Sequence, residues 1–576
     1  MKLTTIRFFL FILAQLPLSH LSGQIYLNLD FETNKYPTLN PKQWKIEASG
    51  YDVSLDSLDV FSGLFSLKIE NHNIQNDTDA EFTSSLPIGF VSSSQTTIRA
   101  KIKTLNIDGI VGIFVGIENS EGKVIAQKEA IAGKNKEHPE WVDISLDIDV
   151  PIDAKKFYFG GRFKGTGTAR FDLFEIIIDG VPYEEKIPPI IFPKKEELAW
   201  LKRNIIPIRT TNPDETNDED LKPFKDILDG IKIVALGEVT HGSKEIFNLK
   251  HRIIKYLSVN LGFDIFSIEA SMPEAYELNK YVIENKGYPK NLIGQMGFWT
   301  WNTEEMLSLV NWMNRHNQKN EKKIHFTGFD MQSHKGAVQT LKSESKGKVL
   351  EVIKKIEHSL DSVKSNTKNG LNLASYYSKD LNFLKDSFSS MSMGKPEKDW
   401  LLQNITILEQ MTNNYHYTMR DYYMATNVNW ILNQNRQSKL ILWAHNGHIK
   451  KSGITMGKYL SEVHQKEYLS VGFAFSEGYY SAIGDSGVKS YKAETSYPGT
   501  YEFFFNAIKE PFFLLDLRNL DTNNENNKWL INKMRLRQTG ALKVENEFYE
   551  TSVTDDFDII IFINQSHASR LLNRSK

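Results

Sequence analysis

The chain of 576 residues contains no cysteine, which excludes disulfides, thiolate metal ligands, a lipid-modified cysteine and a cysteine nucleophile. It also lacks the G-x-S-x-G sequence that presents the serine nucleophile of many hydrolases. The formal net charge of -2 gives no electrostatic reason to expect a nucleic acid or an anionic membrane as partner. What remains is an ordinary globular composition, with 40% hydrophobic and 24% charged residues, and a length that predicts two or more domains.

One apolar run stands out, FFLFILAQLPL at residues 8–18, near the N-terminus. Lys2 and Arg7 precede it and the small residues of SHLSGQ follow it, an arrangement typical of a secretory signal. The run is too short to cross a bilayer comfortably. We therefore predict a signal peptide at residues 1–23 and a secreted or periplasmic protein that has no membrane span after cleavage.

Residues 24–183 have the pattern of an all-β domain. Short alternating runs such as GLFSLKIEN, TTIRAKIKT and GIVGIFVGIEN are broken by Gly, Asn, Asp and Ser at close intervals. This pattern predicts a β-sandwich of the jelly-roll kind. The closing stretch ARFDLFEIIIDG (169–180) looks like the last strand of carbohydrate-binding domains appended to secreted enzymes. A structural accessory domain and a domain that contacts a glycan both remain open.

The sequence pattern changes after VPYEEKIPPIIFPKKEE (181–197), which contains four prolines. Proline stiffens the chain and removes amide donors, so we predict a linker at residues 184–195. From residue 196 to 576, buried-strand runs alternate with helical patterns, which predicts an α/β domain built on a mainly parallel sheet. Between about residues 335 and 434 the pattern is almost entirely helical, so a helical subdomain is expected to be inserted there.

Ionisable residues follow the apolar strand runs of this second part, and they are Glu238 and His241, Glu269, Asp330, His445 and His448, and Asp516. The carboxyl ends of parallel strands share one edge of a sheet, where ligand crevices form. A single acid at the end of a strand often caps a helix instead, which leaves the roles of Asp330 and Asp516 open. Two glutamates and three histidines on three strand ends predict a functional cluster.

Two chemistries are open for this cluster. Imidazole and carboxylate suit zinc, so a metal, if there is one, would be held by His241, Glu269, His445 and His448. The spacings E-x-x-H and H-x-x-H differ, however, from the H-E-x-x-H of zinc proteases. The other chemistry requires no cofactor. A histidine held by a carboxylate takes a proton from water, and a second histidine stabilises the oxyanion.

Five segments occur in the order and approximate spacing of a known family. They are IVALGEVTHGSKEIFNLKHRIIKYLSVNLGFDIFSIEAS (233–271), FTGFDMQ (326–332), RDYYMATNVNWIL (420–432), WAHNGHI (443–449) and FFLLDLR (512–518). From about residue 195 to 566 the chain resembles the erythromycin esterase family. The combination of GE-x-THG with AHNGH, separated by a helical segment, makes the resemblance specific. The predicted signal peptide and β domain fall outside it.

The resemblance implies a hydrolase that adds water to an ester carbonyl, the macrolide lactone in the resistance enzymes, without a serine or cysteine nucleophile. It implies that His241 is the general base and that Glu238 and Glu269 are the acids of the site. His445 and His448 correspond to the paired histidines that the family uses in positioning, metal sensitivity or oxyanion stabilisation.

The residues expected to bind the substrate are Lys250, Asp330, Trp299, Trp301 and Arg420. Lys250 stands where the resistance enzymes often have arginine, and lysine lacks the planar two-pronged donor geometry. The two tryptophans, in MGFWTWNTEEM (296–306), either line a pocket or pack within a helix. The predicted export separates this chain from family members that inactivate drugs in the cytoplasm. It favours an envelope or extracellular ester as an alternative to a macrolide-like lactone.

The main expectation is therefore a hydrolase with a small-molecule ester or lactone substrate and no nucleic acid partner. Two other functions remain open. One is a metal-dependent hydrolase of another ester or peptide class, in which the same cluster binds the ion. The other is a non-catalytic envelope protein that binds glycan through its N-terminal domain.

Overall fold

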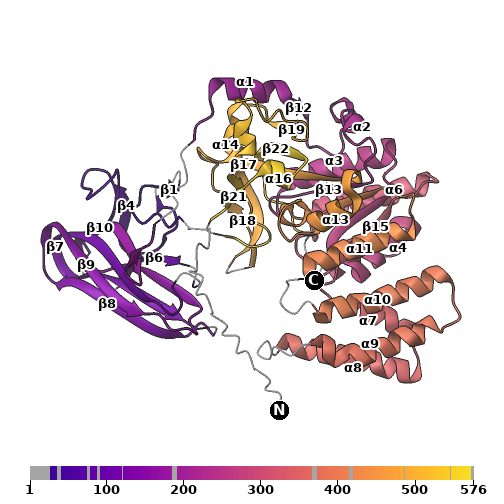
Figure 1. Ribbon diagram of the computed structural model, residues 1–576, viewed down its shortest axis with the longest axis horizontal. Coiled ribbons are helices and arrows are strands. Elements are labelled where there is room, and N and C mark those ends of the chain that lie inside the picture. Colours follow the sequence, from indigo (N-terminus) through magenta and orange to yellow (C-terminus); the bar gives the residue numbers. More distant parts are fainter. Residues whose placement is uncertain are drawn as a thin grey trace, which may run out of the picture. The chain divides into compact units, whose positions relative to one another are not determined.

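The computed structural model describes residues 26–572, except for the segments 36–39, 74–77, 87, 89–90, 120, 185–190, 366–372, 414–418, 485–486 and 545. The predicted signal peptide and residues 185–190 of the predicted linker lie outside the described residues. The chain divides into two compact units, Met1–Pro189 and Ile190–Lys576, and each is described by itself. Figure 1 shows the first unit as strands and the second as mixed strands and helices.

The N-terminal unit is rich in strands, as the sequence predicts. Its strands are β1 (Asn34–Lys35), β2 (Asn40–Pro41), β3 (Lys45–Glu47), β4 (Asp52–Asp56), β5 (Ser66–Asn71), β6 (Asp79–Leu86), β7 (Gln95–Glu118), β8 (Val124–Lys134), β9 (His138–Asp149), β10 (Lys156–Ile178) and β11 (Val181–Pro182). The long strands β7 and β10 pair antiparallel over nearly their whole length. Along β6, the apolar residues Ala80, Phe82 and Leu86 alternate with more exposed ones, which points one face into the core.

The paired strands β7 and β10 approach each other closely at two glycines. Gly109 and Gly165 both have positive φ angles, 150° and 123°. A Cβ on Gly109 would lie 2.0 Å from the carbonyl oxygen of Lys164, so no other residue fits there without moving the partner strand. On one side of these glycines β10 pairs with β6, and on the other it pairs with β5. Both halves contribute to a single apolar core.

The C-terminal unit is built on one mixed sheet with the strand order β12-β19-β22-β17-β13-β16-β14-β15. Its strands are β12 (Ile205–Pro207), β13 (Ile233–Leu236), β14 (Ile265–Ser271), β15 (His325–Asp330), β16 (Leu440–Trp443), β17 (Tyr468–Gly484), β19 (Phe512–Asp516) and β22 (Ile559–Ser566). The pairs from β22 through β15 are parallel. Strand β18 (Gly487–Lys492) pairs with β17, and β20 (Met534–Arg537) with β21 (Phe548–Thr551).

Continuous apolar strand runs are explained by burial of both faces of this sheet. In β13, Ile233 and Ala235 belong to one hydrophobic core, whereas Val234 and Leu236 belong to a second core on the other face. All four side chains are fully buried. Polar groups are therefore tolerated only where a strand ends, which concentrates them at the edge of the sheet.

Helices cover the sheet and fill the segment between β15 and β16 (Figure 1). They are α1 (Lys195–Asn204), α2 (Phe224–Ile227), α3 (Lys244–Asn260), α4 (Met272–Glu284), α5 (Pro289–Gln295), α6 (Glu304–Lys319), α7 (Lys335–Ser343), α8 (Gly347–Ser365), α9 (Leu373–Ser389), α10 (Lys395–Asn413), α11 (Arg420–Gln434), α12 (Asn446–Ile449), α13 (Met456–His464), α14 (Tyr501–Ala507), α15 (Lys528–Ile531) and α16 (Val553–Asp556). Among the helices that the structure describes, none has both the length and the hydropathy needed to cross a bilayer.

Strand β19 corrects one expectation of the sequence analysis. It runs antiparallel to β22, so Asp516 at its C-terminal end pairs with Ile559 at the beginning of β22. Asp516 therefore lies at the opposite edge from the ends of β13 to β16, and it forms an ion pair with Arg518. The expected gathering of every strand-terminal acid at one edge fails here because the direction of the strand is reversed.

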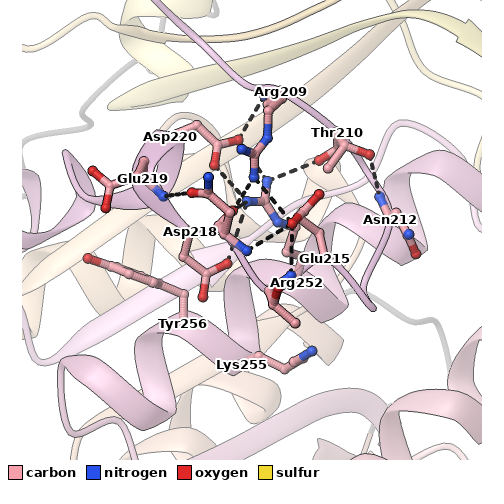
Figure 2. Close-up of polar contacts among 12 residues, drawn as sticks. Arg209, Thr210, Asn212, Glu215, Asp218, Glu219, Asp220, Arg252, Lys255 and Tyr256 are labelled. Atoms are coloured by element: carbon pink, nitrogen blue, oxygen red, sulfur yellow. Dashed lines mark hydrogen bonds and ion pairs between the residues drawn. The ribbon is translucent and has the colours of Figure 1, made fainter.

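Arg252 anchors helix α3 to the segment that precedes β13 (Figure 2). Its guanidinium, on a side chain only 1% exposed, donates two hydrogen bonds to Asp220, at 2.6 and 2.7 Å. It also donates to the backbone carbonyls of Thr210 at 3.1 Å and Asn217 at 2.9 Å. A two-pronged pair of this kind holds a fixed geometry. It therefore fixes the helix that carries Lys250 into the site described below.

The neighbouring His251 predicts loss of stability in acid. It is buried against Trp312, and neither ring nitrogen has a partner among the described residues. Burial, reinforced by the nearby charges of Lys255 and Arg315, lowers the pKa of His251 to about 3. Below pH 6.5 His251 binds a proton in the unfolded chain but stays neutral in the folded chain, so the free energy of unfolding falls as pH falls.

We expect His251→Leu to reduce this pH dependence by up to about 1.4 kcal/mol per pH unit between pH 6 and pH 4. The measurement is the free energy of unfolding in urea at several pH values, followed by tryptophan fluorescence. His72→Leu is the control, because His72 is exposed and forms no ion pair among the described residues. Equal slopes for wild type and His251→Leu would contradict the prediction.

Candidate active site

The C-terminal ends of four adjacent parallel strands bring the predicted cluster together. Strand β13 leads to Glu238 and His241, β14 carries Glu269, β15 ends at Asp330, and β16 leads to His445 and His448. The turns after β13 and β16 are in direct contact, since the Asn446 amide donates to the carbonyl of Glu238 at 2.8 Å. A Cβ on Gly237 would lie 2.1 Å from Asn446 Oδ1, so this approach requires glycine.

Glu238 and His241 form the first half of the site. Glu238 is fully buried, and its Oε1 lies 2.6 Å from His241 Nδ1. The other oxygen accepts hydrogen bonds from Lys250 Nζ at 2.9 Å and from Trp443 Nε1 at 2.5 Å. Burial alone would raise the pKa of Glu238, but the charge of Lys250 and the bond to His241 lower it below its ordinary value. A carboxylate at Nδ1 selects the tautomer that leaves the Nε2 lone pair of His241 for a proton.

His241 keeps that second nitrogen available. No described residue forms a hydrogen bond with its Nε2, and the side chain is 12% exposed although Glu238 behind it is completely buried. The backbone amide of His241 donates to the carbonyl of Gly540 at 3.2 Å, which holds the turn in place. The imidazole is thus oriented by one carboxylate and reachable at the other nitrogen, as a general base must be.

Glu269 and Arg420 form the second half. Arg420 Nη2 lies 2.7 Å from Glu269 Oε1 and 2.7 Å from Asp330 Oδ2. The other oxygen of Glu269 accepts a hydrogen bond from the backbone amide of His445 at 3.0 Å. Although burial opposes ionisation, the charges of His448 and Arg420 hold the pKa of Glu269 well below its usual range. Glu269 therefore stays ionised and ties β14 to both the turn after β16 and helix α11.

His448 is held between two carboxylates. Its Nδ1 lies 2.9 Å from Asp421 Oδ1, and its Nε2 lies 3.3 Å from Glu269 Oε1. Burial alone would lower the pKa of His448, but the charge of Glu269 and the bond to Asp421 raise it to about 10. Arg420 Nη1 also approaches Nε2 to 3.1 Å. Because a guanidinium cannot accept a hydrogen bond, Glu269 is the acceptor that these two cations share.

His445 is the neutral histidine of the cluster. It caps helix α12, and its Nδ1 accepts a hydrogen bond from the Gly447 amide at 3.1 Å. The Nε2 side faces the carbonyl of Val239 at 3.3 Å. Burial, with the neighbouring His241 and His448 adding to it, lowers the pKa of His445 to about 3. Its ring lies 5.3 Å from that of His241, so a neutral imidazole lies beside the base.

Three residues predicted to bind substrate have other surroundings. Lys250 is fully buried against Glu238, with Nζ 4.3 Å from the centre of the Trp443 ring, so it orients the acid and does not reach a ligand. Trp301 is 1% exposed and donates from Nε1 to the Glu269 carbonyl at 3.1 Å, which makes it a core residue beneath the site. Trp299 is half-buried in the turn between α5 and α6, outside this hydrogen-bonded cluster.

Two residues of the cluster were missed from sequence. Asp421 holds His448, and Trp443 donates to Glu238 from the last position of β16. Both lie in segments that carry the family resemblance. Asp421 is next to Arg420, and Trp443 is two positions before His445. An aspartate beside a site arginine was therefore a usable signal, whereas an indole at the end of an apolar run is indistinguishable from a packing residue.

The four side chains considered as metal ligands do not fit a metal centre. Across the described ranges, no group of three or more His, Asp or Glu side chains is placed to hold an ion. A protonated His448 has no lone pair to give, and Arg420 supplies the positive charge at Glu269. The Nδ1 of His445 is already an acceptor for a backbone amide. Ligands must instead be deprotonated and free.

Comparisons with known proteins agree on one family. The family model described as erythromycin esterase matches residues 259–566, more than half of the chain, beginning after His241. A Bacillus subtilis protein named as a hydrolase, YbfO, is 28% identical over an alignment of 369 residues, and the match covers 55% of this chain and 80% of that one. Erythromycin esterase type II of Escherichia coli is 26% identical over 335 residues, covering 49% and 78% of the two chains.

Solved structures are similar to about two thirds of the chain. A Bacillus cereus protein is 27% identical, with a TM-score of 0.57, and the match covers 66% of this chain and all of that one. An erythromycin esterase variant in an open conformation shares the fold at 16% identity, with a TM-score of 0.51 over 63% and 98% of the two chains. The protein is an ester-cleaving hydrolase. The chain belongs to the erythromycin esterase family.

Proposed function

We propose that the enzyme hydrolyses a carboxylic ester or lactone with a water molecule activated by His241, and without a covalent intermediate. The observation that carries the proposal is the 2.6 Å contact between Glu238 Oε1 and His241 Nδ1, combined with an Nε2 that no described residue occupies. Cysteine is absent and the serine elbow is missing, which favours water as the nucleophile.

The reaction follows from the charges around His241. Its Nε2 takes a proton from water as the water oxygen bonds to the carbonyl carbon, and Glu238 stabilises the imidazolium that forms. The negative charge that develops on the carbonyl oxygen is stabilised by Arg420 through Nη1, because Nη2 is paired with Glu269 and Asp330 and both ring nitrogens of His448 face carboxylates. As the carbon–oxygen bond to the alcohol breaks, the imidazolium returns the proton to the leaving oxygen. No cofactor is required for this sequence.

The substrate we propose is a macrolide-like lactone or an ester of the cell envelope or surroundings. The first rests on the relative named erythromycin esterase type II. The second rests on the predicted signal peptide, which makes the protein secreted or periplasmic, and on the strand-rich unit of jelly-roll type that precedes the hydrolase unit. That unit would hold the enzyme near a glycan.

The test is hydrolysis of a panel of lactones and aryl esters by the full chain after dialysis against a chelator. In water labelled with ¹⁸O, a single turnover should place one labelled oxygen in the product acid. Mass spectrometry of the intact protein during turnover should find no acylated species. An acyl-enzyme, or activity that returns only when a divalent metal is added, would overturn the proposal.

A further inference from the structure

Residues 538–540 follow β20 and pair with the turn that carries His241. The backbone amide of Thr539 donates to the carbonyl of Val239 at 3.0 Å, and the amide of His241 donates to the carbonyl of Gly540 at 3.2 Å. Thr539 stands 300 positions after Val239 and outside the five segments that carry the family resemblance. The reaction proposed above makes no use of this residue.

The carbonyl oxygen of Val239 faces three donors. Besides the amide of Thr539, it accepts a hydrogen bond from the Thr539 hydroxyl at 3.1 Å, and Nε2 of His445 lies 3.3 Å from it. A carbonyl oxygen has two lone pairs, so three donors compete for two acceptor sites. The contact of His445 is the longest of the three and exceeds the usual range of an N–H···O bond. The imidazole is therefore the most weakly held of these donors.

His445 carries its proton at that nitrogen. Its Nδ1 accepts a hydrogen bond from the Gly447 amide at 3.1 Å, and the ring is neutral, so its one N–H is on Nε2. His445 is partly exposed, and its ring centre lies 5.3 Å from that of the base, His241. A donor that is weakly bound in the resting enzyme and lies beside the base is suited to an oxygen on which negative charge develops.

A buried ion pair holds Thr539 in place. Arg537, the last residue of β20, is fully buried, and its guanidinium carbon lies 4.4 Å from the centre of the Phe475 ring and 4.5 Å from that of Phe548. The guanidinium is also paired with the carboxylate of Glu547, which is completely excluded from solvent. Because Thr539 follows Arg537 by two positions, these contacts fix it against the turn.

We propose that Thr539 is a positioning residue of the hydrolytic site. Its amide and hydroxyl occupy the Val239 carbonyl, which leaves the Nε2–H of His445 free to bind the carbonyl oxygen of the ester, alongside Nη1 of Arg420. Without the hydroxyl, the Nε2–H forms a full hydrogen bond with Val239 and must break it before it stabilises the oxyanion. The inference rests on the proposed function, because it assigns a donor to the same addition of water.

Replacing Thr539 with valine tests the inference, because valine has a similar volume and no hydroxyl. The kcat for ester hydrolysis by the full chain should fall by about fivefold or more, and KM should stay within about twofold, since the donor acts in the transition state. Thr539→Ser keeps the hydroxyl and should hold kcat within about twofold of the wild type. The Ki of a trifluoromethyl ketone hydrate, which mimics the tetrahedral intermediate, should rise in Thr539→Val by the factor by which kcat/KM falls.

A double-variant cycle with His445→Asn shows whether the effect passes through the imidazole. Asparagine keeps an acceptor for the Gly447 amide but has no Nε2–H, so His445→Asn should lower kcat by about 10²-fold. Adding Thr539→Val to His445→Asn should then change kcat by less than about twofold, because no donor is left to divert. A merely structural role of Thr539 would give the same fivefold loss in both backgrounds.

Thr412→Val is the matched control. It removes another buried hydroxyl, which donates to the carbonyl of Glu409 at 2.8 Å within helix α10, and it should leave kcat unchanged. If circular dichroism shows that Thr539→Val does not fold, Thr539→Ala removes the same hydroxyl and takes its place in every comparison.

An unchanged kcat in Thr539→Val, no rescue by Thr539→Ser, full activity of His445→Asn, or an undiminished loss in the His445→Asn background would overturn the inference. The two proposals fail separately. An acyl-enzyme would refute the proposed function, whereas an unchanged Thr539→Val in an enzyme that forms no acyl-enzyme would refute only the role of Thr539.

Discussion

Replacing His241 with alanine is expected to lower kcat/KM for ester hydrolysis by about 10²–10⁴-fold, the usual contribution of a general base. The turnover number should fall by a similar factor, because the proton is transferred only as the water attacks. The Michaelis constant should change little, since the imidazole gives up an interaction that forms in the transition state. Initial rates across a range of ester concentrations measure both quantities.

The control for this experiment is His316→Ala. His316 lies near the end of helix α6, where its ring is 5.5 Å from that of Trp312, and it has no contact with the cluster. Its rates should match the wild type within about twofold. Full activity of His241→Ala, with the fold verified by circular dichroism, would assign the base to another residue. His445 and His448 are poor replacements, because one is a buried neutral cap and the other is already protonated.

The cluster was predictable because the chemistry lies where apolar strands end. Four buried strands deliver Glu238, Glu269, Asp330 and His445 to one edge, and a local reading of each strand is sufficient to find them. Asp516 shows the limit of that reading. Its strand has the same local pattern, yet β19 runs in the opposite direction, and strand direction is decided by pairing partners far away in the chain.

The roles within the cluster were less predictable than its membership. Lys250 carries a charge and stands near the motif, which suggested a substrate contact. It is buried because helix α3 turns that face toward Glu238, and Arg252 fixes the helix from the other side. For Trp301 a pocket wall and a packed core both remained open in the sequence, because aromatic residues suit both. Only three-dimensional burial distinguishes these cases, and no composition or spacing encodes it.

The buried pair of Glu238 and Lys250 yields the largest expected effect on stability. Both side chains are completely excluded from solvent, and their charged atoms are 2.9 Å apart. Glu238→Gln leaves the ammonium of Lys250 buried without its counter-charge, which is expected to cost about 3–5 kcal/mol. Lys250→Met should cost less, because Glu238 keeps hydrogen bonds from Trp443 and His241.

The double variant Glu238→Gln/Lys250→Met separates the pair from its surroundings. It removes both charges and retains similar volume, so its loss of unfolding free energy should be well below the sum of the losses of the two single variants. Urea unfolding followed by tryptophan fluorescence gives all four values. Strictly additive losses would mean that the two side chains do not stabilise each other in the folded protein.

The pH dependence of Glu238→Gln provides an independent check. Burial already lowers the pKa of Lys250 to about 8, although the charge of Glu238 opposes the shift. Without Glu238 the pKa of Lys250 falls further. Over a wider pH range the unfolded chain then holds a proton on Lys250 that the folded chain has lost. The stability of Glu238→Gln should therefore rise between pH 6 and pH 9 more steeply than that of the wild type. The double variant has no ammonium at this position and should not show the added slope of stability against pH. If the added slope persisted in the double variant, it would come from another titrating group.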